Sequence, residues 1–431
     1  MIQHSNSNKL LLIFICTILS LTVQAKADTE NPLLQTSQTT ITSDSIFRAY
    51  LQQQGYRLTT GNRLKLLTSG RQKFEHLFAD IDKAQESLHL EYFNFRNDSI
   101  GKVLFTHLVH KAQEGVKSRV IFDDFGNMSN SQPLKRKHVK DLIERGLEIV
   151  RFDPIKFPYI NHVFLRDHQK IVVIDDKIGY TGGMNVADYY INGLPEIGPW
   201  RDIHVRIEGP AVKDLQNAFY YNWCRQGGKV HYDIDLTAVP TDTLPEQPGV
   251  GEVAIVQRIP HRAPQSLRHA YVAAIDAAQE NIQIINPYFV PTRSIRKALK
   301  RAIRRGVKVE IMYPSKSDIP FTPHAGYYYA NKMRKAGADV YLFDNGFHHS
   351  KVMMVDRTFC TVGSCNLDSR SLRYDFEINA FIFDDEITGQ LNSLFEDDKE
   401  DSTLYTREVQ AKRPARKKIA GWIAHLLTPF L

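Results

Sequence analysis

Cysteine is scarce in this chain, and the patterns of a disulfide or metal protein are missing. The 431 residues include four cysteines, and no two of them form a Cys-x-x-Cys pair. A disulfide framework or a zinc site is therefore not expected, and buried free thiols are. The chain also has no His-Glu-x-x-His or paired-aspartate pattern that demands a metal. We therefore expect neither a metal ion nor a cofactor.

Long hydrophobic runs are also missing. The apolar run near the amino terminus, Leu10–Val23, has 14 residues (23 − 10 + 1), whereas a membrane-spanning helix needs ~20. Lys9 precedes the run, and small residues at Ala25 and Ala27 follow it. This layout predicts a secretory signal peptide over residues 1–27 and a protein of the bacterial periplasm or the periplasmic face of the inner membrane. An uncleaved amino-terminal anchor is the alternative.

The overall composition is that of a basic globular protein. Hydrophobic residues make up 42% and charged residues 24% of the chain, as in ordinary folded proteins. The formal net charge is +7, and removal of Lys9 and Lys26 with a signal peptide would leave +5 (7 − 2). A positive charge favours an anionic partner, either phospholipid headgroups or nucleic acid, and does not choose between them.

Helix-period and strand-period patterns alternate along the chain, which indicates α/β units. We expect helices over 99–114 and 294–305, and strands over 119–122 and 147–152. Glycines that follow helices recur at a spacing of 191 residues (306 − 115 and 337 − 146). The second half of the chain therefore repeats the first.

One motif occurs once in each half. It consists of a histidine, a lysine two residues later, an aspartate seven residues after the histidine and an asparagine beyond a glycine. The two copies are His168, Lys170, Asp175 and Asn185, and His349, Lys351, Asp356 and Asn366. All four positions recur at one offset of 181 residues (349 − 168). Because strand side chains alternate, the histidine and lysine of each copy are expected to begin a buried strand and share a face.

This doubled motif resembles that of the phospholipase D superfamily, and the flanks Tyr180–Asn185 and Val362–Ser371 resemble its bacterial cardiolipin synthase branch. The resemblance extends from about residue 60 to 385. It implies an α/β protein in which two similar α/β sandwich halves pack pseudo-symmetrically around one active site.

The expected divisions of the chain follow from this resemblance and from composition. They are a signal peptide (1–27), a flexible lead (28–44), a first phospholipase D-like half (45–228), a proline-bearing linker (229–249), a second half (250–401) and a basic amphipathic tail (402–431). The two offsets differ by ten residues (191 − 181), which lie before His168. We expect an aromatic loop there, over 154–164, that either lines the mouth of the site or packs on itself.

The tail combines cations with an apolar stripe. Six cations lie between residues 407 and 418, and Ile419, Trp422, Ile423, Leu426 and Leu427 fall on one helical face. This pattern suits an interfacial helix on anionic lipid. A helix docked on the protein core would show the same stripe.

The resemblance implies a metal-free transfer through a phosphohistidine. By analogy, neutral His168 attacks phosphorus and protonated His349 gives a proton to the departing alcohol. The two motif lysines and two motif asparagines would neutralise the phosphate oxygens. Asp202 and Glu377, which match acidic positions of the family, would orient the histidines.

Two motif aspartates and one neighbouring histidine have other expected roles. Asp175 and Asp356 belong to the catalytic motif, yet seven residues beyond each histidine they are expected to brace the local strand and turn. His348, next to His349, is taken as incidental.

We therefore expect a phosphatidyltransferase that makes cardiolipin from phosphatidylglycerol at a phospholipid membrane. The alternative is an exported phospholipase D that hydrolyses phospholipids to phosphatidic acid. A nuclease of the same fold is less favoured, because no aromatic ladder accompanies the cations, so nucleic acid is not expected as a partner. The sequence leaves the oligomeric state open.

Overall fold

The computed structural model describes residues 41–156, 164–229, 249–319 and 322–427. The predicted signal peptide lies outside these residues, as do most of the predicted lead and linker and residues 157–163 of the predicted loop.

The elements before residue 230 are α2 (Ser43–Gln53), β1 (Thr59–Leu67), α3 (Gly70–Lys83), β2 (Ser87–Tyr92), α4 (Ser99–Gln113), β3 (Lys117–Asp123), α5 (Asp124–Ser129), α6 (Arg136–Glu144), β4 (Glu148–Phe152), β5 (Lys170–Ile174), β6 (Ile178–Gly182), α7 (Tyr189–Asn192), β7 (Trp200–Arg201), β8 (His204–Glu208) and α8 (Val212–Arg225).

The later elements follow the same order. They are β9 (Gly251–Arg258), α9 (Ser266–Ala277), β10 (Asn281–Ile285), α10 (Arg293–Arg304), β11 (Lys308–Pro314), α11 (Thr322–Arg334), β12 (Asp339–Phe343), β13 (Phe347–His348), β14 (Val352–Val355), β15 (Phe359–Gly363), α12 (Ser369–Arg373), β16 (Glu377–Phe383), α13 (Asp385–Glu400), β17 (Ser402–Leu404), α14 (Arg407–Lys412) and α15 (Ala415–Leu427).

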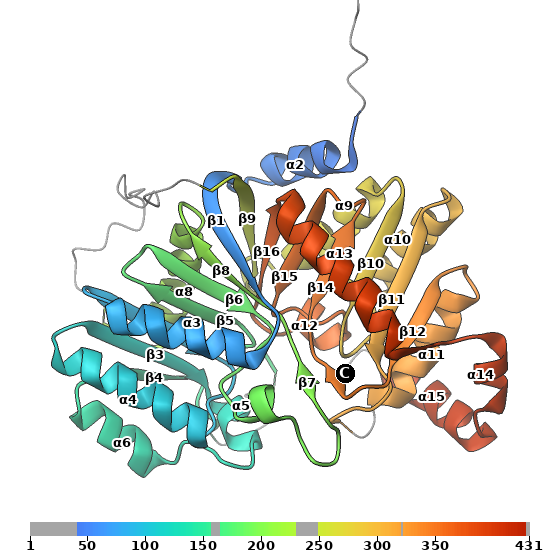
Figure 1. Ribbon diagram of the computed structural model, residues 1–431. Coiled ribbons are helices and arrows are strands. Elements are labelled where there is room, and N and C mark those ends of the chain that lie inside the picture. The colour runs from blue at the N-terminus through green and yellow to red at the C-terminus, as the bar shows by residue number, and fades with distance from the viewer. Residues whose placement is uncertain (1–40, 157–163, 230–248, 320–321, 428–431) are drawn as a thin grey trace, which may run out of the picture. The chain divides into compact units, whose positions relative to one another are not determined.

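Two matching sets of strands form one continuous sheet (Figure 1). From its centre outward, one set runs β1-β8-β6-β5-β2-β3-β4 and the other β9-β16-β15-β14-β10-β11-β12, with β17 added at the second edge. The antiparallel pair β1–β9 joins them. The predicted α/β class is confirmed, and the structure adds that the two sets share a sheet.

Local sequence explains where four of the helices end. Gly115, Gly146, Gly306 and Gly337 follow α4, α6, α10 and α11 with φ of 94°, 105°, 94° and 106°. A residue with a Cβ rarely adopts this left-handed conformation, so these glycines end the helices. The helices predicted over 99–114 and 294–305 are therefore found as α4 and α10, with ends shifted by one residue.

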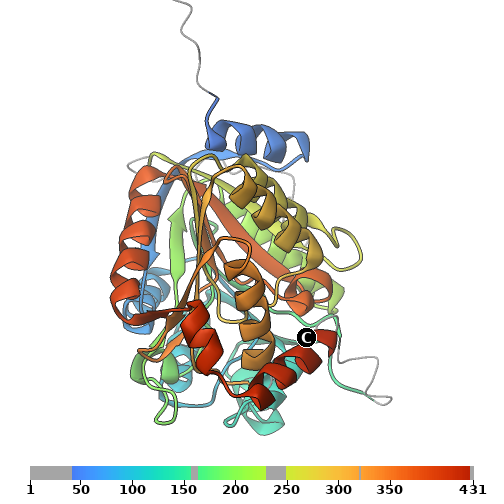
Figure 2. The ribbon, with the colours of Figure 1, turned by 90° about the vertical axis from the view of Figure 1, so that its right-hand side faces the viewer.

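Helices cover the outer faces of the sheet, and the two sets share an inner core. Side chains of α3 and α4 pack on the first set, and those of α9, α10 and α11 pack on the second. In Figure 2 the second set lies between α13 on one side and α9 and α10 on the other. Ile171 and Val173 of β5 share a buried cluster with Val352 and Met354 of β14. The side chains of the two motif strands, β5 and β14, therefore contribute to one core that both sets share.

Candidate active site

Each motif histidine lies in an extended segment just before its strand and is hydrogen-bonded to the other set of strands. The His168 N–H donates to the Phe376 carbonyl over 3.0 Å, and the His349 N–H donates to the Arg201 carbonyl over 2.7 Å. The expectation that both histidines begin the strands is wrong, because β5 begins at Lys170 and β14 at Val352. The reason is that the backbone N–H of each histidine donates to the other set of strands and not to a neighbouring strand of its own set.

The imidazoles also pair across the molecule. His168 Nδ1 lies 2.9 Å from Glu377 Oε1, and His349 Nδ1 lies 2.6 Å from Asp202 Oδ2. Asp202 and Glu377, 1% and 0% exposed, are fully buried. A carboxylate can only accept, so Nδ1 carries the proton and Nε2 of each ring is left for chemistry. The two expected orienting acids are therefore in place, each serving the histidine of the other motif.

Burial sets the protonation of these pairs. It holds the pKa of His168 and of His349 well below the ordinary value, and the Lys170 and Lys351 ammonium groups lower both further. Burial also raises the pKa of Asp202 to about 6 and that of Glu377 to about 7. Burial therefore favours the neutral form of both rings.

The two motif lysines are buried beside the histidines. Lys170 Nζ donates to the His168 carbonyl over 2.5 Å, and Lys351 Nζ donates to the His349 carbonyl. Burial lowers the pKa of Lys170 to about 8 and that of Lys351 to about 7. An ammonium group has three donors, so each can also donate to a substrate oxygen.

The two motif asparagines sit on turns held in matching ways. Asn185 and Asn366 are 6% and 5% exposed, and their side-chain Oδ1 atoms have no hydrogen-bond partner among the described residues. A hydrogen bond holds each turn at the residue before its asparagine. The Met184 N–H donates to His204 Nδ1, and the Cys365 N–H donates to Asn379 Oδ1. Sequence reasoning missed His204 and Asn379, although each follows an orienting acid by two residues (204 − 202 and 379 − 377).

Both histidines and both asparagines line a single cleft of about 550 Å³. Its other lining residues include five aromatic side chains, three acidic ones and one arginine: Phe93, Tyr189, Tyr190, Trp200, Tyr288, Asp318, Asp368, Asp375 and Arg370. Trp200 was also missed by sequence reasoning. Its indole N–H is buried without a hydrogen-bond partner among the described residues, so it is free to donate to a ligand.

Asp175 and Asp356 are not brought into this cleft. The Asp175 carboxylate accepts hydrogen bonds from three successive backbone N–H groups, at residues 85–87, each over 2.8 Å. Asp356 does the same at residues 279–281. Both aspartates adopt positive φ, 50° and 49°, at the far ends of β5 and β14. Their geometry is that of a brace between strand and turn.

His348 is not incidental. It is 1% exposed, and its Nε2 lies 2.9 Å from Asp398 Oδ2 on α13, which also pairs with Arg201. β13 pairs with β7 in parallel, His348 opposite Arg201. This buried contact holds β7 and β13 in place. Asp202 follows directly after β7 and His349 directly after β13, so the contact also positions these two residues.

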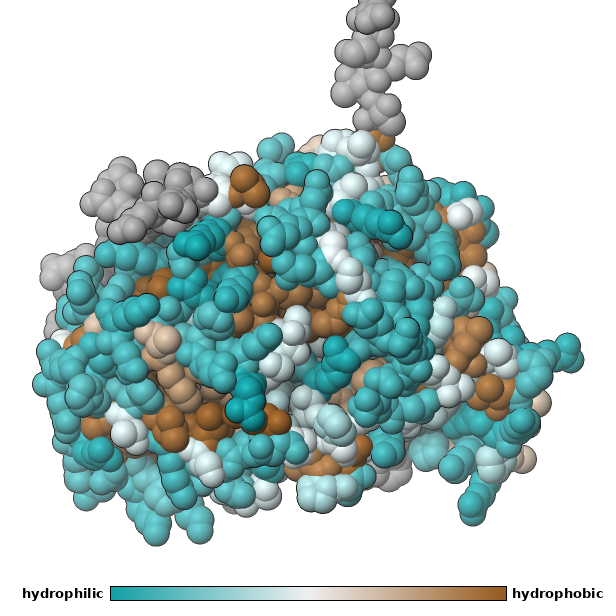
Figure 3. All heavy atoms as spheres, in the orientation of Figure 1, coloured by the Kyte–Doolittle hydropathy of each residue, from teal (hydrophilic) through white to brown (hydrophobic). Residues whose placement is uncertain are grey.

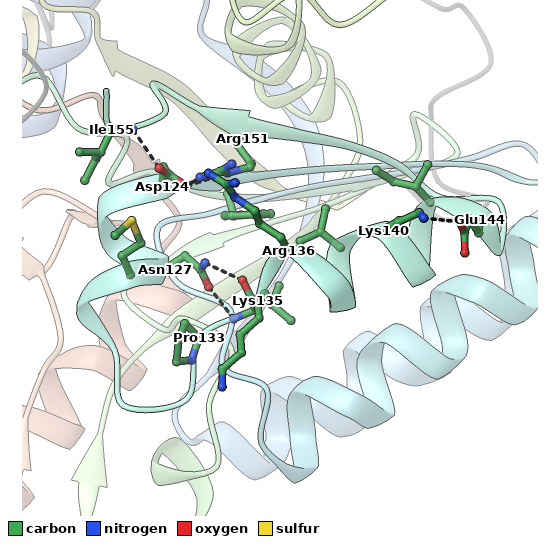
Figure 4. Close-up of a pocket in the computed structure, with 14 residues that line it drawn as sticks. Asp124, Asn127, Pro133, Lys135, Arg136, Lys140, Glu144, Arg151 and Ile155 are labelled. Atoms are coloured by element: carbon green, nitrogen blue, oxygen red, sulfur yellow. Dashed lines mark hydrogen bonds and ion pairs between the residues drawn. The ribbon is translucent and has the colours of Figure 1, made fainter. Parts of the chain in front are cut away.

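A second cavity, of about 720 Å³, is lined mainly by residues of α5, of α6 and of the loop between them (Figure 4). Four of its charged groups form two ion pairs, Arg151 with Asp124 and Lys140 with Glu144, and Lys135 and Arg136 also line it. Asp124 also accepts the Ile155 N–H. No histidine lines it, so the cleft with both motif histidines is the candidate active site.

The fold and the paired histidines define a phospholipase D-like protein, and comparison with known proteins specifies the family. Residues 77–223 and 271–399 match the family described as "Cardiolipin synthase, PLD-like domain". The major cardiolipin synthase of Bacillus subtilis is 39% identical over 376 residues, 86% of this chain and 76% of that protein. Cardiolipin synthase 1 of Staphylococcus epidermidis is 37% identical over 387 residues, 90% and 78% of the two chains. The chain belongs to the cardiolipin synthase family.

A solved structure supports the fold. The crystal structure of phosphatidylserine synthase from Haemophilus influenzae superposes with a TM-score of 0.68, covering 90% of this chain and 100% of that one. Sequence identity is 14%, so this likeness concerns the fold alone.

The kinship corrects the expected localisation. Export to the periplasm by a signal peptide is contradicted by the relatives, which are cardiolipin synthases. The apolar run Leu10–Val23 misled because its length and flanks satisfy the pattern of a signal without being specific to one. Residues 1–27 lie outside the described part of the chain. Among the residues that are described, no helix is both long enough and apolar enough to cross a membrane.

Proposed function

We propose that this protein is a phosphatidyltransferase that makes cardiolipin from two molecules of phosphatidylglycerol through a phosphohistidine. The observation that carries the proposal is the pair of buried imidazoles, each with a carboxylate on Nδ1, on one cleft. Such an arrangement leaves two Nε2 atoms to act on one phosphodiester. We also retain as a proposal that residues 45–228 and 250–401 are the two phospholipase D-like halves.

In the first step, neutral His168 Nε2 attacks the phosphorus of phosphatidylglycerol. The bond from phosphorus to the headgroup oxygen breaks, and His349 Nε2–H gives its proton to that oxygen, so glycerol leaves. His349 needs a proton for this step. Because the bound phosphodiester is an anion, it raises the pKa that burial had lowered and favours the imidazolium.

In the second step, a hydroxyl of another phosphatidylglycerol attacks phosphorus. His349 Nε2 takes the proton of that hydroxyl, the bond from phosphorus to His168 breaks, and cardiolipin is formed. His349 is then protonated again, as it was when the first step began, because the proton given in that step is regained in the second.

The lysines and asparagines would stabilise charge on the non-bridging oxygens. Asn185 and Asn366 line the cleft, and Lys170 and Lys351 lie beside the histidines that do. We expect each oxygen to meet one ammonium and one amide. Removal of one such donor costs about 10²–10³-fold in kcat. The aromatic side chains Tyr189, Tyr190 and Trp200 give the cleft an apolar wall, which suits the exclusion of water that separates transfer from hydrolysis.

Lipid products and the intermediate test this proposal. Purified protein with phosphatidylglycerol should release cardiolipin and glycerol in equal amounts. His168→Ala should abolish turnover, about 10⁴-fold or more. His349→Ala lacks the acid of the first step and the base of the second, so it should form a phosphatidyl-protein adduct slowly and keep it, with a P–N bond that is stable to alkali and labile to acid.

Other products would contradict it. Phosphatidic acid as the main product would make the protein a hydrolase, and DNA cleavage without lipid turnover would make it a nuclease. An adduct retained in His168→Ala and lost in His349→Ala would reverse the two roles.

A further inference from the structure

The last helix, α15, packs on α11 through its small residues. Gly421 is buried, and a Cβ at this position would lie 2.8 Å from the His324 carbonyl oxygen. Ala424 is 6% exposed. His425 stacks on Tyr328 of α11 with ring centroids 4.3 Å apart. The side of α15 that touches the protein is therefore fixed by close contacts.

The large apolar side chains of α15 face outward instead. Ile419, Trp422, Ile423 and Leu426 are 59%, 55%, 50% and 55% exposed. A helix at the surface of a globular protein normally buries its large apolar residues and exposes its small or polar ones. On the face seen in Figure 3, hydrophilic side chains predominate around a central group of hydrophobic ones. A contiguous apolar surface like that on α15 indicates a binding face.

Cations adjoin this apolar surface. Lys412, Arg416 and Lys417 are exposed, and within the described part of the chain none of them forms an ion pair. The segment from 407 to 418 carries six cations and a single acid, Glu408. The charge of the surroundings therefore selects an anionic partner over a neutral one.

We propose that α15 and the basic segment before it dock the protein on an anionic phospholipid surface. The four apolar side chains would enter the headgroup region, and the cations would meet lipid phosphates, as in amphipathic helices that lie in the plane of a membrane. Only the identity of the lipid, an anionic phospholipid such as phosphatidylglycerol, rests on the proposed function.

The position of α15 relative to the cleft fits this role. Ile319, 44% exposed, lines the cleft, and α11 begins at Thr322, just beyond it. Gly421 contacts the carbonyl of His324 in the first turns of α11. A lipid surface bound by α15 would thus lie beside the rim through which a phospholipid substrate enters.

Trp422 offers a direct test. The chain has three tryptophans, and Trp200 and Trp223 are 7% and 1% exposed, so Trp422 dominates the response of fluorescence to a surface. With vesicles of phosphatidylcholine and phosphatidylglycerol, the emission should shift to the blue and resist an aqueous quencher. Vesicles of phosphatidylcholine alone should produce a smaller shift. Trp422→Phe should lose the response, and an unchanged wild-type spectrum would overturn the proposal.

Paired variants measure the two contributions by vesicle sedimentation. I419S/I423S and R416Q/K417Q should each bind anionic vesicles roughly 10-fold more weakly than wild type. I46S/V103S replaces exposed apolar residues on α2 and α4, and K297Q/K300Q removes exposed cations from the basic helix α10. Both control pairs should bind as wild type. Tail variants that bind like the controls would overturn the proposal.

Two further readouts separate the competing explanations. Turnover of a soluble short-chain phosphatidylglycerol should be unchanged in the tail variants. Wild type that binds vesicles but does not turn over this substrate would refute the proposed function and leave the docking surface intact. If I419S/I423S instead turns a dimer into a monomer with vesicle binding unaltered, the face is covered by a second copy and the proposal fails.

Discussion

At the scale of residues, the ionisation of Asp202 and Glu377 should control the pH dependence of catalysis. Burial raises their pKa values to about 6 and about 7, so each takes up a proton as the pH falls through these values. The pKa values of both acids are higher in the folded protein than in the unfolded chain. The protonated acids therefore stabilise the fold at low pH, and this stability is lost as the pH rises through the folded-state pKa values. A protonated acid no longer holds the imidazole Nδ1–H. We expect kcat/KM for phosphatidylglycerol to fall below about pH 7.

Glu377→Gln should lower kcat/KM by about 10³–10⁴-fold and move the remaining acidic limb towards pH 6, the value for Asp202. Asp175→Asn is the matched control, because Asp175 lies outside the cleft and bonds only to backbone N–H groups at residues 85–87 in the described contacts. An acidic limb that stays in place in Glu377→Gln, or shifts in Asp175→Asn, would contradict this assignment.

Sequence reasoning identified the residues that repeat and missed those that do not. His168 and His349, with their lysines and asparagines, recur at one offset, so each copy supported the other. Trp200 has no such counterpart, and its buried, unpaired N–H is visible only in three dimensions. His348 looked incidental because its partner, Asp398, is 50 residues away.

At the scale of elements, helices ended by glycine were predictable, and the shortest elements were not. α4 and α10 end where Gly115 and Gly306 stop them, a local effect that one sequence reveals. β7 and β13 contain two residues each, too few for any periodicity. The sequence also placed residues up to 44 in a flexible lead, whereas α2 begins at Ser43. Phe47 and Leu51 of α2 are buried against α9 and the second set of strands.

The contact of β13 with α13 should be necessary for both stability and catalysis. His348→Ala leaves Asp398, 1% exposed, without its imidazole partner, which costs about 1–3 kcal/mol. It also loosens the strand pair that sets the His349 N–H on the Arg201 carbonyl. We expect a lower midpoint of thermal unfolding and a fall in kcat that exceeds the change in KM. His110→Ala, at a histidine whose side chain is 70% exposed, should leave both unchanged.

At the scale of the whole molecule, the sequence showed that the chain is duplicated and did not show how the copies depend on each other. His168 and Glu377 are 209 residues apart, and Asp202 and His349 are 147 apart. Their pairing depends on the sheet formed by β1 and β9 and on the core between β5 and β14. A repeat in one sequence reveals two similar units, whereas crossed pairing is a property of their packing.

Because each pair draws on both sets of strands, a complete site requires both motifs in one chain. Mixing the inactive His168→Ala and His349→Ala proteins should therefore restore no activity, since neither contains an intact cleft. If two chains exchanged halves, mixed dimers would contain a site with both histidines, and up to about a quarter of wild-type activity would return by random assortment. The variants should be tested both after simple mixing and after joint unfolding and refolding. Recovery under either condition would show that the cleft forms between chains, and its absence in both would assign one active site to each chain.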